Sequence, residues 1–132
     1  MARKIIALLL LLITVVNPAM AQTQDQLNTQ ACAARDKAEK QLQKTIASIK
    51  SKWKDDAVFL AKFETAQDAW RKFADAQFQM IYPAEDKTFE YGSVYPMCAC
   101  SEMASEIRDR IRQLQPWTTP QVEGDVCPVG SR

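Results

Sequence analysis

The sequence predicts an all-α protein, a small disulfide-stapled bundle of three main helices with a long ordered loop between the second and third helices. Three observations support this prediction. Apolar residues recur every three or four positions in three separate segments. Only 3 glycines occur in 132 residues, so few breaks interrupt those segments. Four cysteines follow residue 21, and a chain of this length suits a single domain.

The N-terminal residues 1–21 have the features of a secretory signal peptide. Two basic residues precede an apolar run over residues 5–16, and residues 19–21, Ala-Met-Ala, form a small-residue cleavage pattern. The run is too short to span a membrane stably. We therefore expect cleavage before Gln22, a periplasmic or secreted location, and no membrane contact afterwards. The remaining residues 22–132 are predicted to form one helical domain with an irregular C-terminal tail.

The first predicted helix runs from about residue 25 to residue 53. Its apolar positions are spaced as on one face of a helix, and neither Gly nor Pro interrupts it. This face contains Leu27, Ala31, Ala34, Ala38, Leu42, Ile46, Ile49 and Trp53. The polar residues that follow can turn the chain, and Asp55 or Asp56 is expected to cap the next helix.

The second predicted helix runs from about residue 57 to residue 81. Its buried stripe is expected to contain Leu60, Phe63, Trp70, Phe73 and either Gln77 or Phe78. The spacing of its aromatic residues favours a core stripe over the alternative, a ligand groove. Pro83 ends this helix because a proline disfavours the helical conformation of the residue before it.

Residues 83–97 show no helical period and contain two prolines and one glycine, so they are predicted to form an ordered loop. The third helix is expected to begin near Ala99 or Ser101 and to stop at Pro116. Its apolar face contains Met103, Ile107, Ile111 and Leu114, at spacings of four, four and three.

Composition excludes several classes of function. The chain has no histidine, which rules out Ser-His-Asp triads, Cys-His pairs and zinc sites that contain histidine. The three glycines do not form a phosphate-binding loop. Without residues 1–21, 17 − 2 = 15 basic residues face 16 acidic ones, so no nucleic-acid partner is expected. We predict a protein that is not an enzyme and needs no cofactor.

The four cysteines allow three interpretations. Cys98 and Cys100 could be ligands of a soft metal such as Cu(I), or a reactive dithiol. They could instead belong to two structural disulfides, which an exported compartment and the isolated positions of Cys32 and Cys127 favour. We predict the pairs Cys32–Cys100 and Cys98–Cys127.

The loop is the main candidate for a binding surface. It carries Glu85, Asp86 and Glu90, together with Tyr91 and Tyr95. Acidic groups mixed with tyrosines suit a basic protein partner, and loops on rigid scaffolds often carry binding residues. The alternative is that the tyrosines fold the loop back onto the helices, and the sequence leaves both interpretations open.

A series of lysines on the first helix could bind an anionic polymer. The series comprises Lys37, Lys40, Lys44, Lys50, Lys52 and Lys54. Because Asp36 and Glu39 lie among these lysines and the net charge is near zero, a solvated helix face is the preferred interpretation.

Several short segments, in order, resemble the DUF1311 family, whose members are described as lysozyme inhibitor LprI-like N-terminal domains. The segments are Ala66-Gln67-x-Ala69-Trp70, then Gly92-Ser93, then Cys100 followed by Ser105 and Arg108, with Cys32 matching an N-terminal cysteine. The resemblance covers about residues 28–115. Family members often have a further cysteine where this chain has Phe78, and the pair Cys98–Cys127 would replace the bridge that it makes.

The resemblance implies a small, helical, exported protein-binding module. It also implies that the protein partner is a lysozyme-type cell-wall hydrolase, which the module would inhibit. Two other functions are carried as alternatives. One is an envelope scaffold or chaperone-like module without a hydrolase partner, and the other is a thiol redox or copper-handling protein that uses Cys98 and Cys100.

Overall fold

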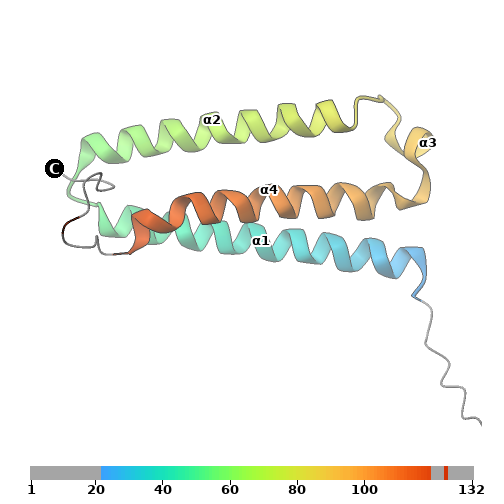
Figure 1. Cartoon of the computed structure of the whole chain (residues 1–132), viewed down its shortest axis with the longest axis horizontal. Coiled ribbons are helices and arrows are strands. Elements are labelled where there is room, and N and C mark those ends of the chain that lie inside the picture. The colour runs from blue at the N-terminus through green and yellow to red at the C-terminus, as the bar shows by residue number, and fades with distance from the viewer. Residues whose placement is uncertain (1–21, 120–123, 125–132) are drawn as a thin grey trace, which may run out of the picture.

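The computed structural model describes residues 22–119 and Gly124. These residues form α1 (Gln24–Lys52), α2 (Ala57–Ile81), the short α3 (Lys87–Tyr91), a 3₁₀ turn η1 (Gly92–Val94) and α4 (Tyr95–Thr118), as Figure 1 shows. No strand occurs in the described part, so the predicted all-α bundle of three long helices is confirmed. None of these helices is long and apolar enough to cross a membrane. The predicted signal peptide and most of the tail lie outside the described residues.

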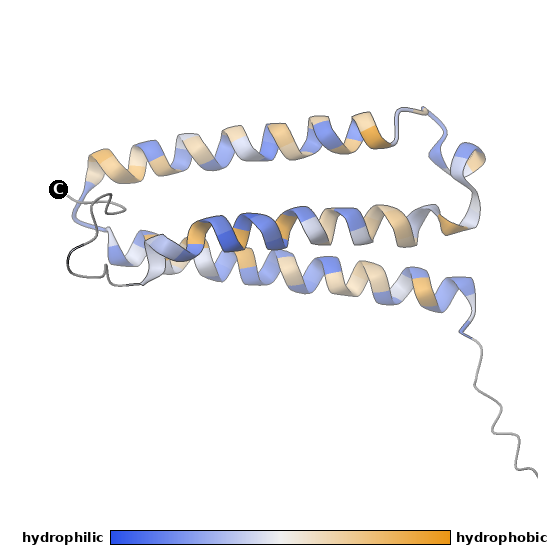
Figure 2. Ribbon diagram, in the orientation of Figure 1, coloured by the Kyte–Doolittle hydropathy of each residue, from blue (hydrophilic) through white to orange (hydrophobic). Residues whose placement is uncertain are grey.

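The three long helices are arranged as a close pair and a single helix. α1 and α4 run side by side in the same direction, while α2 runs in the opposite direction and stands farther from them (Figure 1). This arrangement follows from the connections, because a tight turn reverses the chain after α1 and the α3–η1 segment reverses it again after α2. Apolar and polar stretches recur along all three long helices (Figure 2), which is typical of amphipathic helices.

Side-chain caps define the starts of α1 and α2. Thr23 and Gln26 form a reciprocal capping box at the start of α1. The Asp56 carboxylate accepts a hydrogen bond from the Phe59 backbone N–H at 2.8 Å, so Asp56 is the predicted cap of α2. α2 ends at Ile81. This is the end that Pro83 predicts, because a proline disfavours the helical conformation of the residue before it.

The core lies mainly between α1 and α4 and is extended by one face of α2. Its buried members are Ala38, Leu42, Ile49, Phe63, Trp70, Ile107 and Leu114. Aromatic rings close the bundle at the α1–α2 turn. There Trp53 lies 4.6 Å from Phe59 and 6.2 Å from Trp117 between ring centroids, and its indole N–H donates to the Trp117 carbonyl.

The prediction that Phe73 belongs to the core was wrong. Its side chain is 56% exposed, whereas Trp70 is 8% exposed and Phe63 6% exposed. Three residues advance a helix by about 300°, so Phe73 lies at the edge of the apolar stripe. Among residues 22–119 no other helix covers α2 on that side, so the edge of the stripe stays in solvent.

The prediction that residues 83–97 lack helical structure was also wrong. The Asp86 carboxylate accepts a hydrogen bond from the Phe89 N–H at 2.9 Å and starts α3. Gly92, with φ of 70°, ends α3 in a conformation that favours glycine. A helix of five residues is too short for a hydrophobic period to reveal it.

The bounds of the third long helix differ from the prediction at both ends. α4 begins at Tyr95, with Pro96 in its first turn, where a helix does not need the missing N–H. It also continues through Pro116 to Thr118. Trp117 packs against Phe59 with ring centroids 5.2 Å apart, which holds this last turn in place.

Candidate functional site

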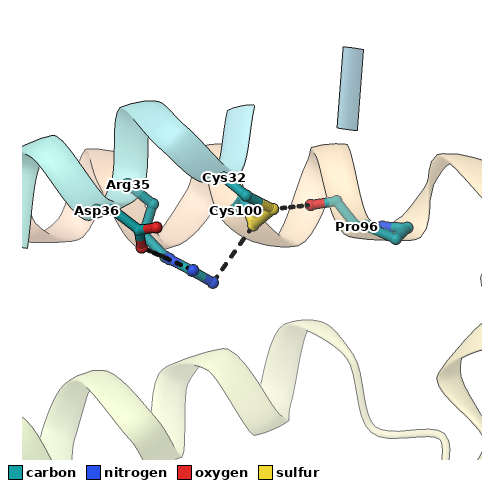
Figure 3. Close-up of polar contacts among 5 residues, drawn as sticks. All are labelled: Cys32, Arg35, Asp36, Pro96 and Cys100. Carbon is teal, nitrogen blue, oxygen red and sulfur yellow. Dashed lines mark hydrogen bonds and ion pairs between the residues drawn. A yellow bond between two sulfur atoms is a disulfide. The ribbon is translucent and has the colours of Figure 1, made fainter. Parts of the chain in front are cut away.

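One of the two predicted disulfides is present and joins α1 to α4. Cys32 and Cys100 form a bond with an S–S distance of 2.02 Å and a Cα–Cα distance of 4.9 Å. The Arg35 guanidinium reaches the Cys100 sulfur at 3.4 Å and pairs with Asp36 at 2.7 Å (Figure 3). On the other side, the Cys32 sulfur lies 3.7 Å from the Pro96 carbonyl oxygen (Figure 3).

The bond also decides between the interpretations of Cys98 and Cys100. Because Cys100 is bonded to Cys32, the two neighbours do not form a dithiol. On α4 they lie about 200° apart around the helix axis, which also keeps them from binding one metal together. No group of three or more possible metal ligands occurs in the described part of the chain.

Cys98 is half-buried and has no disulfide partner within residues 22–119. Its predicted partner, Cys127, lies outside the described residues. The pair Cys98–Cys127 therefore stays a prediction.

Three tyrosines brace the α3–η1 segment against the ends of α2 and α4. The rings of Tyr82, Tyr91 and Tyr95 lie 5.2–5.8 Å apart between centroids. The Tyr91 hydroxyl accepts a hydrogen bond from the Ala84 backbone N–H at 3.2 Å. Burial raises the pKa of the Tyr82 phenol, and the nearby Cys98 adds to the shift. The predicted binding residues Tyr91 and Tyr95 are thus half-buried and fold the segment back onto the helices.

The three predicted acidic residues occupy the exposed side of the same segment. Asp86 caps α3, whereas Glu85 and Glu90 are exposed and have no ion-pair partner among the described residues. Between them Phe89 is 86% exposed, the highest value among the large apolar side chains that lie in solvent. Glu85, Phe89 and Glu90 together are called the α3 tip below.

Phe89 was not among the residues predicted to bind. Asp86, three residues before Phe89, is a signal for the start of a short helix, but it does not show which side chains of that helix face solvent. Aromatic side chains are enriched in protein interfaces, so an exposed ring at this position favours a protein contact.

The lysine series lies on α1 and in the turn after it, and its members either make local contacts or face solvent. Lys50 pairs with Glu64 of α2 at 2.8 Å, and Lys52 donates to the Thr119 carbonyl at 2.7 Å. The other members of the series are exposed: Lys37, Lys40, Lys44 and Lys54. This distribution fits the preferred interpretation, a solvated helix face.

A groove of about 410 Å³ lies between α2 and the α1–α4 pair. Residues of all three helices line it: Arg35, Asp36, Glu39, Trp70, Arg71, Ala74, Asp75, Gln77, Phe78, Ile81, Glu102, Met103, Glu106 and Ile107. Trp70 therefore belongs to the core and also forms part of a groove wall, which combines the two interpretations of the aromatic stripe.

Polar contacts join α2 to the other two helices around this groove. The Trp70 indole N–H donates to Glu106 at 3.2 Å, and Arg71 pairs with Glu39 at 2.5 Å. The hydrogen bond from Arg71 lowers the pKa of the Glu39 carboxyl, although burial acts in the opposite direction.

A further polar contact involves two residues near Trp70. The buried Gln67 amide oxygen accepts a hydrogen bond from the Arg110 side chain at 2.8 Å. Burial lowers the pKa of Arg110, whose guanidinium also lies 5.7 Å from the Trp70 ring centroid.

The motif residues Gln67 and Trp70 thus connect α2 to α4. Their partners, Glu106 and Arg110, were not predicted from the sequence.

One comparison with known proteins found a family match. The model of the family described as "Lysozyme inhibitor LprI" matches residues 16–114. Comparisons with curated proteins and with solved structures found no match. The family match covers most of the 132 residues and confirms the resemblance seen in the sequence. The chain belongs to the lysozyme inhibitor LprI family.

Proposed function

We propose that this protein is an exported binding module that inhibits a lysozyme-type cell-wall hydrolase, and that the α3 tip makes the contact. The observation that carries the proposal is Phe89, an aromatic side chain that is 86% exposed between two unpaired carboxylates. Family membership supports a protein-binding role of this kind.

The α3 tip stands on a rigid base, which favours tight binding. Lys87 donates hydrogen bonds to the Tyr82 and Ala84 carbonyls, both at 2.8 Å, and the Asp86 cap fixes the start of α3. The tyrosine rings fill the space beneath the segment. A surface that is already ordered loses little conformational entropy when it binds.

The chemistry of the α3 tip suits a basic partner with a cleft. Hydrolases of this class cleave glycosidic bonds with two carboxyl groups in a cleft, and an inhibitor needs only to occupy it. An aromatic side chain can anchor in such a cleft, while Glu85 and Glu90 attract a positively charged enzyme. The proposed mechanism is steric exclusion of the substrate and requires no catalytic group in this chain.

Reversing the two free carboxylates, Glu85→Lys with Glu90→Lys, should weaken inhibition of a basic lysozyme. We expect a loss of about tenfold or more, mainly in the association rate, because unpaired rim charges steer the encounter. Raising the salt concentration should weaken inhibition by the unchanged protein and have less effect on the variant. The measurement is lysis of a cell-wall suspension at two ionic strengths, with Asp86 left unchanged because it caps α3.

The matched control is Lys40→Gln with Lys44→Gln, two exposed charges on α1. This variant should inhibit like the unchanged protein. Loss of inhibition in the control alone would move the contact to the lysine face. Absence of inhibition by the unchanged protein would reject the inhibitor function and leave the scaffold or chaperone-like alternative.

A further inference from the structure

We propose that the groove between α2 and the α1–α4 pair binds a small amphiphilic cation, a linear apolar body that carries a protonated amine. This site is separate from the proposed inhibitory contact, because its residues belong to α1, α2 and α4 and none belongs to α3. The proposal therefore does not depend on the proposed function.

The apolar part of the site is suited to an alkyl or aryl body. Ala74 and Phe78 of α2, with Met103 and Ile107 of α4, are among the apolar residues that line the groove. A volume of about 410 Å³ lies within the range of sites that hold small molecules, roughly 300–1,000 Å³.

The charges of the lining select a cation. The groove is lined by five carboxylates and two guanidinium groups, which gives 2 − 5 = −3. Each guanidinium is already paired, Arg35 with Asp36 at 2.7 Å and Arg71 with Glu39 at 2.5 Å. The three remaining carboxylates have no cationic partner among residues 22–119: Asp75, Glu102 and Glu106.

Glu106 is the best-placed of these carboxylates. Its two oxygens accept hydrogen bonds from the Trp70 indole at 3.2 Å and from the Gln77 amide at 3.3 Å. Both donors are neutral, so they fix the orientation of the carboxylate without neutralising its charge. Glu102 lies one helical turn before Glu106 on α4, on the same side of the helix. Two half-buried carboxylates beside an apolar wall form a site for an ammonium group with an apolar tail.

The test uses decylamine, 1-decanol and decanoate, each titrated calorimetrically into the protein below its micelle concentration. These probes share one chain length and differ in the charge of the head group. We expect decylamine to bind at least about tenfold more tightly than 1-decanol, because its ammonium group would contact partly buried carboxylates. Decanoate should bind most weakly, because its carboxylate would be repelled by them.

Two pairs of variants locate the charge selection. Glu102→Gln with Glu106→Gln keeps the size of the side chains and one acceptor oxygen, which can serve the Trp70 indole, while the Gln77 amide can turn its own oxygen toward the new amide NH2. This variant should reduce the preference for decylamine to about twofold. The matched control, Glu85→Gln with Glu90→Gln, removes the same charge from the α3 tip and should retain the full preference.

Equal binding of the three probes, or binding of none, would overturn the proposal with the unchanged protein alone. An equal loss of preference in both variant pairs would also overturn it, since the effect would then come from net charge rather than from the groove.

Discussion

Replacement of Trp70 by alanine should lower the free energy of unfolding by about 3–5 kcal/mol, as large-to-small changes in a core do. The Trp70 side chain is 8% exposed and lies in the core cluster with Phe63 and Ile107. It also donates to Glu106, so the variant loses one of the hydrogen bonds between α2 and α4 as well as buried apolar area. Urea unfolding followed by circular dichroism at 222 nm measures this loss.

Phe73→Ala is the matched control for this prediction. Phe73 lies on the same helix but is 56% exposed, so its removal should change stability by about 0.5 kcal/mol or less. Equal losses in the Trp70 and Phe73 variants would contradict the position of α2, because α2 would then bury a different face.

Removal of the Cys32–Cys100 bond by Cys32→Ala with Cys100→Ala should destabilise the protein by about 2–5 kcal/mol. The bonded cysteines are 68 residues apart, and the loop between them contains all of α2 and α3. Closing so long a loop removes much conformational entropy from the unfolded chain. Urea unfolding without reductant measures the change, and an unaffected midpoint would contradict the stabilising role of this bond.

A thiol titration of the denatured, unreduced protein tests the second predicted bond. No titratable thiol is expected if Cys98 and Cys127 are bonded. The 118 − 98 = 20 residues from Cys98 to Thr118 rise about 30 Å along α4, and the 127 − 118 = 9 residues that follow span at most about 32 Å. A bond within one chain is therefore within reach, and a non-reducing gel distinguishes it from a bond between chains.

The long helices could be predicted from the sequence, because an apolar period of three and four residues that continues over more than twenty positions is typical of an amphipathic helix. The pair Cys32–Cys100 was also predicted correctly. The structure of residues 83–97 could not be predicted in the same way. α3 depends on one cap and one glycine, and Pro96 occupies a helix start that resembles a break in the sequence.

The surroundings of α2 could not be predicted from periodicity. A period shows which face of a helix is apolar but not how many neighbouring helices cover that face. Phe73 and Trp70 carry the same signal in the sequence, yet Trp70 is 8% exposed and donates a hydrogen bond to Glu106 of α4, whereas Phe73 is 56% exposed. The groove and the contacts of Glu106 and Arg110 depend on the spacing between helices, which no single segment specifies.

The proposed contact at the α3 tip is tested most directly by the dissociation rate of a lysozyme complex with Phe89→Ala. We expect dissociation to accelerate about thirtyfold or more, since a buried aromatic anchor contributes about 2 kcal/mol or more to binding. The control is Phe73→Ala, which removes an exposed ring from α2 instead of α3. Because Phe73 lies outside the proposed interface, this change should leave the dissociation rate within about twofold. Unchanged dissociation for Phe89→Ala, or acceleration by Phe73→Ala instead, would contradict the assignment of the inhibitory contact to α3.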